Sequence, residues 1–119
     1  MTRINCIPVS ELTDQHLLAE YRELPRLANL ARLPRKNEVF PESYRMGAGH
    51  VKFFYNKGAY LKDRFENGLV KEMVRRGFKP TFTYYKPHPD GLNEDWQPTI
   101  DDEMINASRI NDRLDGVKG

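Results

Sequence analysis

Cysteine is almost absent from this chain, since Cys6 is the only one among 119 residues. A lone cysteine cannot form an internal disulfide, so we expect a reducing compartment, the cytoplasm. It lies in a short apolar patch beside Ile7, which predicts a small core residue rather than a reactive thiol. No CxxC or HxxxH spacing occurs either, so the sequence predicts no metal site and no cofactor.

Long hydrophobic runs are also missing. No apolar stretch approaches the length of a bilayer crossing, and the first residues lack the apolar core of a signal peptide, so we expect no membrane association. Hydrophobic residues make up 39% of the chain and charged residues 30%, a balance that argues against wholesale disorder. A chain of 119 residues can bury a core, and we expect one domain over residues 1–119.

The charges are unevenly distributed behind a net charge of +2. Residues 1–89 hold 16 Lys and Arg against 9 Asp and Glu, whereas residues 90–103 hold six acidic residues and no basic one. A cationic body is compatible with a polyanionic partner such as DNA. It is equally compatible with an ordinary soluble surface, so charge alone leaves both interpretations open.

Hydrophobic periodicity predicts a first helix that begins between Ser10 and Asp14 and continues to Arg32. Apolar residues recur there at alternating spacings of four and three, which is typical of one buried stripe. Pro25 lies inside this pattern and removes one backbone donor, so we expect a bend rather than a break. The stripe consists of Leu17, Tyr21, Leu24, Ala28 and Ala31.

Two further helices are predicted, with irregular loops between them. The second runs from Asn56 to Gly77 and the third opens at Thr99, where Asp102 completes a capping box. The expected inward rows are Leu61, Phe65, Leu69 and Met73 in the second helix, and Met104, Ala107, Ile110 and Leu114 in the third. The sequence therefore predicts a compact all-α domain of three main helices.

The opposite face of the first predicted helix is polar. At about 100° per residue, five side chains share one sector away from the apolar stripe: Gln15, Ala19, Arg22, Glu23 and Arg26. One interpretation is a solvated face with ion pairs one turn apart. The other starts from Arg22 and Arg26, like charges one turn apart, which would suit a site that grips the phosphates on both sides of a nucleotide.

Several stretches of the chain are shared with a known family. "MTRIN", "VSEL", "DQHL", "AEYRELPR", "GAGHV", "FFY" and "RRGF" resemble the phage-type pyrimidine-dimer DNA glycosylase and abasic-site lyase family, often called endonuclease V. The resemblance covers residues 1–27 almost without gaps, then residues 47–78, and more loosely residues 98–115. It implies a small domain of three helices, in agreement with the periodicity, and a monomer in a bacterial or phage-infected cell.

The resemblance also implies a mechanism that acts on double-stranded DNA with a damaged or abasic nucleotide. Removal of Met1 would leave a free α-amine on Thr2, whose unperturbed pKa of about 7.7–8.0 lies far below that of a lysine. The amine would attack C1′ of the damaged nucleotide, expel the base and form a Schiff base, and β-elimination would then cleave the strand. Glu23 matches the acidic catalytic residue, which would stabilise the cationic intermediate and transfer protons.

Several further positions match DNA-contacting residues of the family. On this basis Arg3, Arg22 and Arg26 are expected to contact DNA, Gln15 and His16 to face it, and Arg109 and Arg113 to bind backbone phosphates. His50 matches by the "GAGHV" motif. Two alternatives stay open: His50 as a structural capping residue, and His16 as a half-buried packing residue.

The chain also departs from the family pattern. The family ends in a tail rich in Trp and Tyr, whereas no aromatic residue follows Trp96 here, and the connection from Arg32 to Gly47 is shorter. The acidic stretch around Asp95 has no counterpart. These differences leave the amine and glutamate chemistry intact, but the lesion stays open between a pyrimidine dimer and another damaged or modified base.

The remaining alternatives concern stacking surfaces and the function as a whole. Tyr84, Tyr85 and Trp96 could supply replacement stacking surfaces, or could pack beneath a crossing loop. The chain could also be a DNA-binding module without catalysis. A plain helical domain, in contrast, would show no salt-dependent affinity for DNA.

Overall fold

The computed structural model describes the backbone of residues 4–118 and the side chains of residues 4–110. Within these residues the fold is all-α, as predicted, and its only β-type pairing is an isolated bridge between Lys57 and Asn93. No described helix combines the length and the hydropathy that a membrane-spanning segment needs. The helices are α1 (Asp14–Glu23), α2 (Leu27–Leu30), α3 (His50–Phe53), α4 (Gly58–Asp63), α5 (Val70–Arg75) and α6 (Ile100–Lys118).

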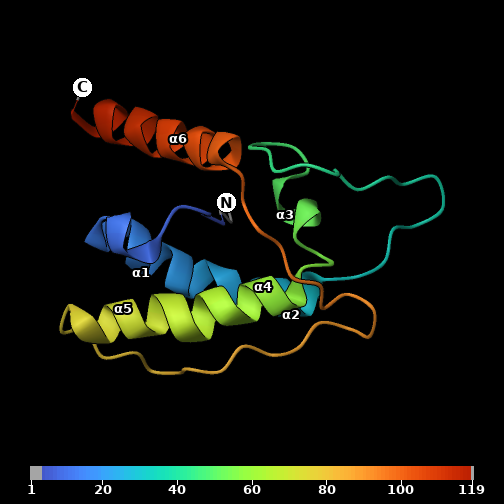
Figure 1. Ribbon diagram of the computed structural model, residues 1–119, viewed down its shortest axis with the longest axis horizontal. Coiled ribbons are helices and arrows are strands. Elements are labelled where there is room, and N and C mark those ends of the chain that lie inside the picture. The colour runs from blue at the N-terminus through green and yellow to red at the C-terminus, as the bar shows by residue number, and fades with distance from the viewer. Residues whose placement is uncertain (1–3, 119) are drawn as a thin grey trace.

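The two long helical stretches lie side by side and α6 lies over them (Figure 1). The stretch from α1 to α2 and the stretch from α4 to α5 run in opposite directions. The N-terminal segment, residues 4–7, passes between α1 and α6, and hydrogen bonds join it to both helices. Residues 78–98 return along α5 and α4 to the start of α6.

The first predicted helix is confirmed, with the expected distortion at Pro25. The hydroxyl of Thr13 accepts a hydrogen bond from the backbone of His16 and so caps α1. A 3₁₀ turn, Leu24–Arg26, contains Pro25 and joins α1 to α2 without a break. The helix ends at Leu30, two residues earlier than predicted, because Ala31 already has an extended backbone (ψ 132°). All five residues of the predicted stripe are buried.

The second predicted helix is also confirmed, and its inward row is buried. It consists of α4, a π-helical segment (Arg64–Leu69) and α5, so it begins two residues later than predicted. Its end lies at the expected glycine: Gly77 adopts φ +91°, and the amide of Phe78 donates to the carbonyl of Met73 at 2.8 Å. A left-handed glycine of this kind is a common helix terminator.

Helix α6 has the predicted capping box. The amide of Thr99 donates to the carboxylate of Asp102 at 2.9 Å, and the amide of Asp102 donates to the Thr99 hydroxyl at 3.1 Å. The placement of Met104 in the inward row is wrong, because this side chain is 63% exposed. Asn106, which is fully buried, faces inward instead, since its amide bonds the N-terminal segment. The side chain of Leu114 lies outside the described residues.

Helix α3 follows the predicted loop and was not anticipated. Gly49, its N-cap, has φ +84°, and a Cβ at this position would meet Cγ of Pro41 at 2.7 Å. A side chain would therefore be strained by the backbone and blocked by the loop. This turn directs the next residue, His50, into the interior, where it contacts the N-terminal segment.

Candidate functional site

The start of the described chain is held by side chains from the long loop and α3. The amide of Ile4 donates to Nε2 of His50 at 2.8 Å, and the hydroxyl of Tyr44 donates to the carbonyl of Ile4 at 3.0 Å. Because Nε2 accepts, Nδ1 carries the ring proton and donates to the carbonyl of Arg45 at 2.7 Å. His50 is buried, so its contacts fix the backbone at Ile4, where the described chain begins.

Helix α6 holds the next residues of the same segment. The side-chain oxygen of Asn106 accepts from the amides of Cys6 at 2.7 Å and Ile7 at 3.2 Å. Its NH₂ group donates to the side-chain oxygen of Asn5 at 2.7 Å. Asn106 thus satisfies three polar groups of the segment in the interior, where an unsatisfied group would be costly.

A buried ion pair between Arg64 and Glu20 also bonds the N-terminal segment. Arg64 donates to both carboxylate oxygens of Glu20, from Nε at 2.5 Å and from a terminal nitrogen at 3.0 Å, and also to the carbonyl of Ile7 at 2.9 Å. Asn5 donates to the same carboxylate at 2.8 Å. Burial by itself lowers the pKa of Arg64, but the charge and hydrogen bonds of Glu20 outweigh it, so the guanidinium pKa is raised.

This ion pair was not predicted, although the sequence contains a signal for it. Glu20 lies three residues after Leu17 and directly before Tyr21, and Arg64 lies three residues after Leu61. Both charged residues therefore share the faces of their helices with the predicted core residues. Charged side chains are almost never fully buried unless they are paired, so two charges in facing apolar stripes indicate a buried pair.

Replacing Arg64 with methionine is expected to lower the free energy of unfolding by about 3–5 kcal/mol, because Glu20 would stay buried without its counter-charge. Urea unfolding at pH 7 measures the change. The Lys62→Met variant is a matched control from the same helical stretch, since the pair of Lys62 with Glu66 is half-exposed and is worth at most about 1 kcal/mol. Equal losses in the two variants would contradict the assigned importance of the buried pair.

The outer face of α1 and of the 3₁₀ turn that follows it presents the polar sector that the sequence predicted. Gln15, Arg22 and Arg26 are exposed. Glu23 is partly buried, with 27% of its side chain accessible, and its carboxylate lies 3.1 Å from the guanidinium of Arg26. His16 is half-buried, and its Nδ1 lies 2.7 Å from the Thr13 hydroxyl, so it belongs to the cap of α1.

The N-terminal segment lies back over the first helix, as the proposed chemistry requires. Asn5 contacts α1 at Glu20, one turn before Glu23, and the segment runs antiparallel to α1 (Figure 1). The segment therefore extends from Asn5 back to Ile4 in the same direction in which α1 continues from Glu20 to Glu23. Thr2 and Arg3 themselves lie outside the described residues.

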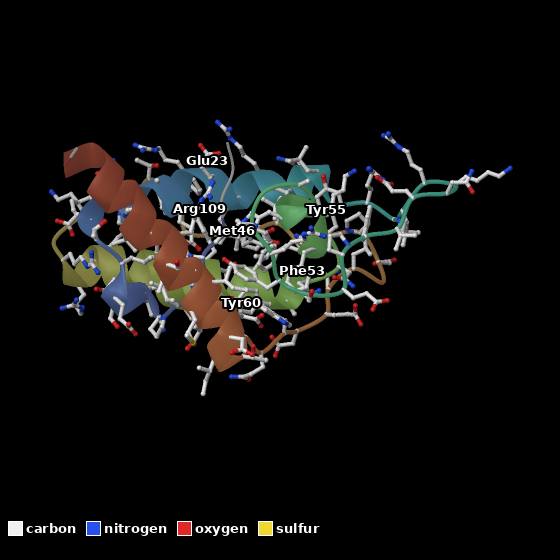
Figure 2. All side chains as sticks on the ribbon, turned by 90° about the horizontal axis from the view of Figure 1, so that it is seen from above. Glu23, Met46, Phe53, Tyr55, Tyr60 and Arg109 are labelled. Atoms are coloured by element: carbon white, nitrogen blue, oxygen red, sulfur yellow. The ribbon has the colours of Figure 1, made fainter. Side chains whose placement is uncertain are left out.

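Helix α6 contributes Arg109, which is exposed. Figure 2 shows Arg109 beside Met46 of the long loop, and Glu23 at the end of α1 in the same half of the molecule. A shallow hollow of about 370 Å³ lies between α6 and the loop, lined by Met46, Met104, Ile105, Ser108 and Arg109. Arg113 follows one turn later, and its side chain lies outside the described residues.

The aromatic residues considered as stacking surfaces are mostly structural. Tyr85 is fully buried, and Trp96 packs on Phe53 and Tyr60 with ring centroids 5.2 and 5.0 Å away. Tyr85 therefore packs in the interior, and Trp96 is partly buried against the core, so both are packing residues. Tyr84 is exposed, and Nζ of Lys62 lies 4.6 Å from its ring.

The lone cysteine behaves as the sequence predicted. Burial raises the pKa of the Cys6 thiol to about 12, so almost none of the reactive thiolate is present near neutral pH. Among residues whose side chains are described, no three His, Cys, Asp or Glu residues gather as metal ligands would.

A comparison with protein families identifies one that matches this chain. The sequence model of a family described as pyrimidine dimer DNA glycosylase matches residues 1–86. The matched range contains α1 to α5, the N-terminal segment and all the residues that hold it except Asn106.

Proposed function

Since the chain belongs to the pyrimidine dimer DNA glycosylase family, we propose that it excises a damaged pyrimidine from double-stranded DNA and then cleaves the strand as an abasic-site lyase. The family makes it a DNA glycosylase with DNA as its substrate. The proposal adds the lyase step, the pyrimidine dimer as the lesion, and the residues that carry out the reaction.

The proposed nucleophile is the α-amine of Thr2 after removal of Met1. An α-amine has an unperturbed pKa of about 7.7–8.0, so a substantial fraction is neutral and nucleophilic at neutral pH. Its nitrogen forms a bond to C1′ as the glycosidic bond breaks, and the base leaves with a proton. The C1′–O4′ bond of the sugar then breaks and O4′ takes up a proton, which leaves a Schiff base between the amine and C1′. The Schiff base acidifies the C2′ proton, and β-elimination removes this proton and breaks the bond from C3′ to its oxygen, so the 3′ phosphate is the leaving group.

Glu23 is the proposed catalytic carboxylate. As an anion it would stabilise the positive charge that develops on the sugar and on the Schiff base. It could also take up and return protons during base loss and elimination. Its partial burial limits screening by water, which strengthens the electrostatic stabilisation.

One observation carries the proposal: the N-terminal segment is fixed against α1 at Glu20, one turn before Glu23. The hydrogen bonds of Ile4 with His50 and Tyr44 anchor the backbone two residues after the proposed nucleophile. We propose that the two intervening residues place the amine against the carboxylate of Glu23.

We propose that DNA binds over the exposed sector of α1 and the adjoining part of α6. Arg22 and Arg26 would bind phosphates on one side and Arg109 on the other, since exposed guanidinium groups suit bidentate contacts to phosphate. The same surface would include Arg3, Gln15, His16 and Arg113. For His50, which is buried, we propose that it positions the N-terminal segment instead of contacting DNA.

Loss of one of these arginines is expected to weaken DNA binding and to flatten its dependence on salt. In Arg22→Ala, Arg26→Ala or Arg109→Ala, the slope of log K against log salt should fall by about one unit, because one phosphate contact is lost. Fluorescence anisotropy with an abasic-site duplex over a range of salt concentrations measures the slope. Lys71→Ala, which removes an exposed charge from α5, should leave the slope unchanged. An unchanged slope in an arginine variant would remove that residue from the interface.

The proposed reaction is tested by borohydride trapping on a duplex that contains an abasic site. Borohydride reduces the Schiff base to a stable amine, so we expect a covalent adduct that peptide mapping assigns to Thr2. An adduct on a lysine would contradict the proposed nucleophile. Salt-dependent binding without any adduct would leave a DNA-binding module that lacks catalysis.

A further inference from the structure

From the geometry around the N-terminal segment, we infer that Asn5, Glu20, Arg64 and Asn106 are positioning residues for the reaction. They form one buried polar network that sets where the α-amine of Thr2 lies relative to Glu23. This inference rests on the proposed function, because it assigns a role to the network only if the α-amine is the nucleophile.

The network joins the segment to all three long helical stretches. Asn106 connects the segment to α6, and Glu20 connects it to α1. Arg64 connects it to the π-helical segment between α4 and α5. Asn5 lies at the centre, since it accepts from Asn106 and donates to Glu20. The segment thus has a fixed distance to three separate parts of the fold at once.

The hydrogen bonds also fix the register of the segment. The amides of Cys6 and Ile7 share one acceptor on Asn106, and the carbonyl of Ile7 accepts from Arg64. A shift by one residue would leave these groups without partners in the interior, at the full cost of desolvation. No buried polar side-chain atom among the described residues lacks a partner, so the observed register satisfies the whole network.

Stability alone does not account for this arrangement. Apolar residues of similar volume often stabilise a core as well as a buried ion pair does, or better. Directional hydrogen bonds add something that apolar contacts do not, namely a defined position for the backbone. Attack on C1′ requires a near-attack distance of about 3–3.5 Å, and a displacement of about 1 Å costs on the order of 100-fold in rate. A segment that ends in the nucleophile therefore needs this kind of restraint.

The inference predicts a selective loss of chemistry in Asn106→Ala and in Asn5→Ala. At saturating abasic DNA, the single-turnover rate of borohydride trapping should fall about 100-fold, while the Kd for the same DNA stays within about threefold of wild type. Trapping rates and Kd values are measured below the unfolding transition of each variant. Asn5 lies outside the helices, so Asn5→Ala changes no helical residue and decides the question if Asn106→Ala does not fold.

Ile110→Ala is the matched control for a general loss of packing. Ile110 lies one turn after Asn106 on the same buried face of α6, and its side chain has no polar atom. This variant should lose stability but trap DNA at nearly the wild-type rate. An equal slowing in Ile110→Ala would overturn the inference, and so would a wild-type rate in either folded asparagine variant. If the wild-type chain itself forms no adduct, the proposed function fails. This result differs from the two outcomes that would overturn the inference alone, because in those the wild-type chain still forms the adduct.

Discussion

Adding one residue ahead of Thr2 is expected to abolish the covalent adduct with abasic DNA. The extension converts the α-amine into an amide, whose nitrogen is not a nucleophile, and the new terminus is displaced by about 3.5 Å. Exposed lysines would not replace it, since an unperturbed lysine pKa of about 10.4 leaves the ammonium protonated at neutral pH. The measurement is borohydride trapping, with mass spectrometry to establish which residue begins each preparation.

Thr2→Ser is the control for this result. It keeps a small residue at position 2, so Met1 should still be removed and a primary α-amine should still be present. We expect this variant to trap DNA at close to the wild-type rate, because the main-chain nitrogen and not the hydroxyl is the proposed nucleophile. Equal adduct formation by the extended chain would show that another amine carries the chemistry.

Glu23→Gln is expected to slow strand cleavage by about 10²–10⁴-fold while DNA binding is largely kept. Glutamine has nearly the same shape as glutamate, but it can neither offset a developing positive charge nor exchange a proton. Single-turnover cleavage of an abasic duplex and anisotropy on the same duplex separate the two effects. Because the carboxylate also lies next to Arg26, we expect binding to change by no more than a small factor.

Asp14→Asn is the matched control on the same helix. Asp14 pairs with Arg76 at the exposed start of α1, far along the helix from Glu23, and its removal should leave the cleavage rate unchanged. Normal cleavage by Glu23→Gln would rule out a catalytic role for that carboxylate.

Local sequence features predicted the helices well because each depends on nearby residues. The capping box at Thr99, the distortion at Pro25 and the terminating Gly77 are all determined within a few residues, and all three are found. The polar sector of α1 was predicted for the same reason, since helical geometry alone places it opposite the apolar stripe.

The interior contacts of the site could not be predicted in the same way. Met104 was expected inside and Asn106 was not considered, because periodicity assigns the apolar side chain to the core. Asn106 faces inward because it bonds residues about 100 positions earlier in the chain. Partners at that separation are set by the tertiary fold, so helix periodicity can indicate that a polar side chain is buried but not which groups it bonds.

Helix α6 carries both a proposed DNA contact and a tether of the reactive segment. Arg109 and Asn106 are three residues apart on it, one exposed and the other buried. Because the side-chain oxygen of Asn106 accepts from the amides of Cys6 and Ile7, one packed helix relates the position of a phosphate at Arg109 to the position of these amides. We therefore expect DNA bound at Arg109 to meet the amine in a defined position, without any rearrangement of the N-terminal segment.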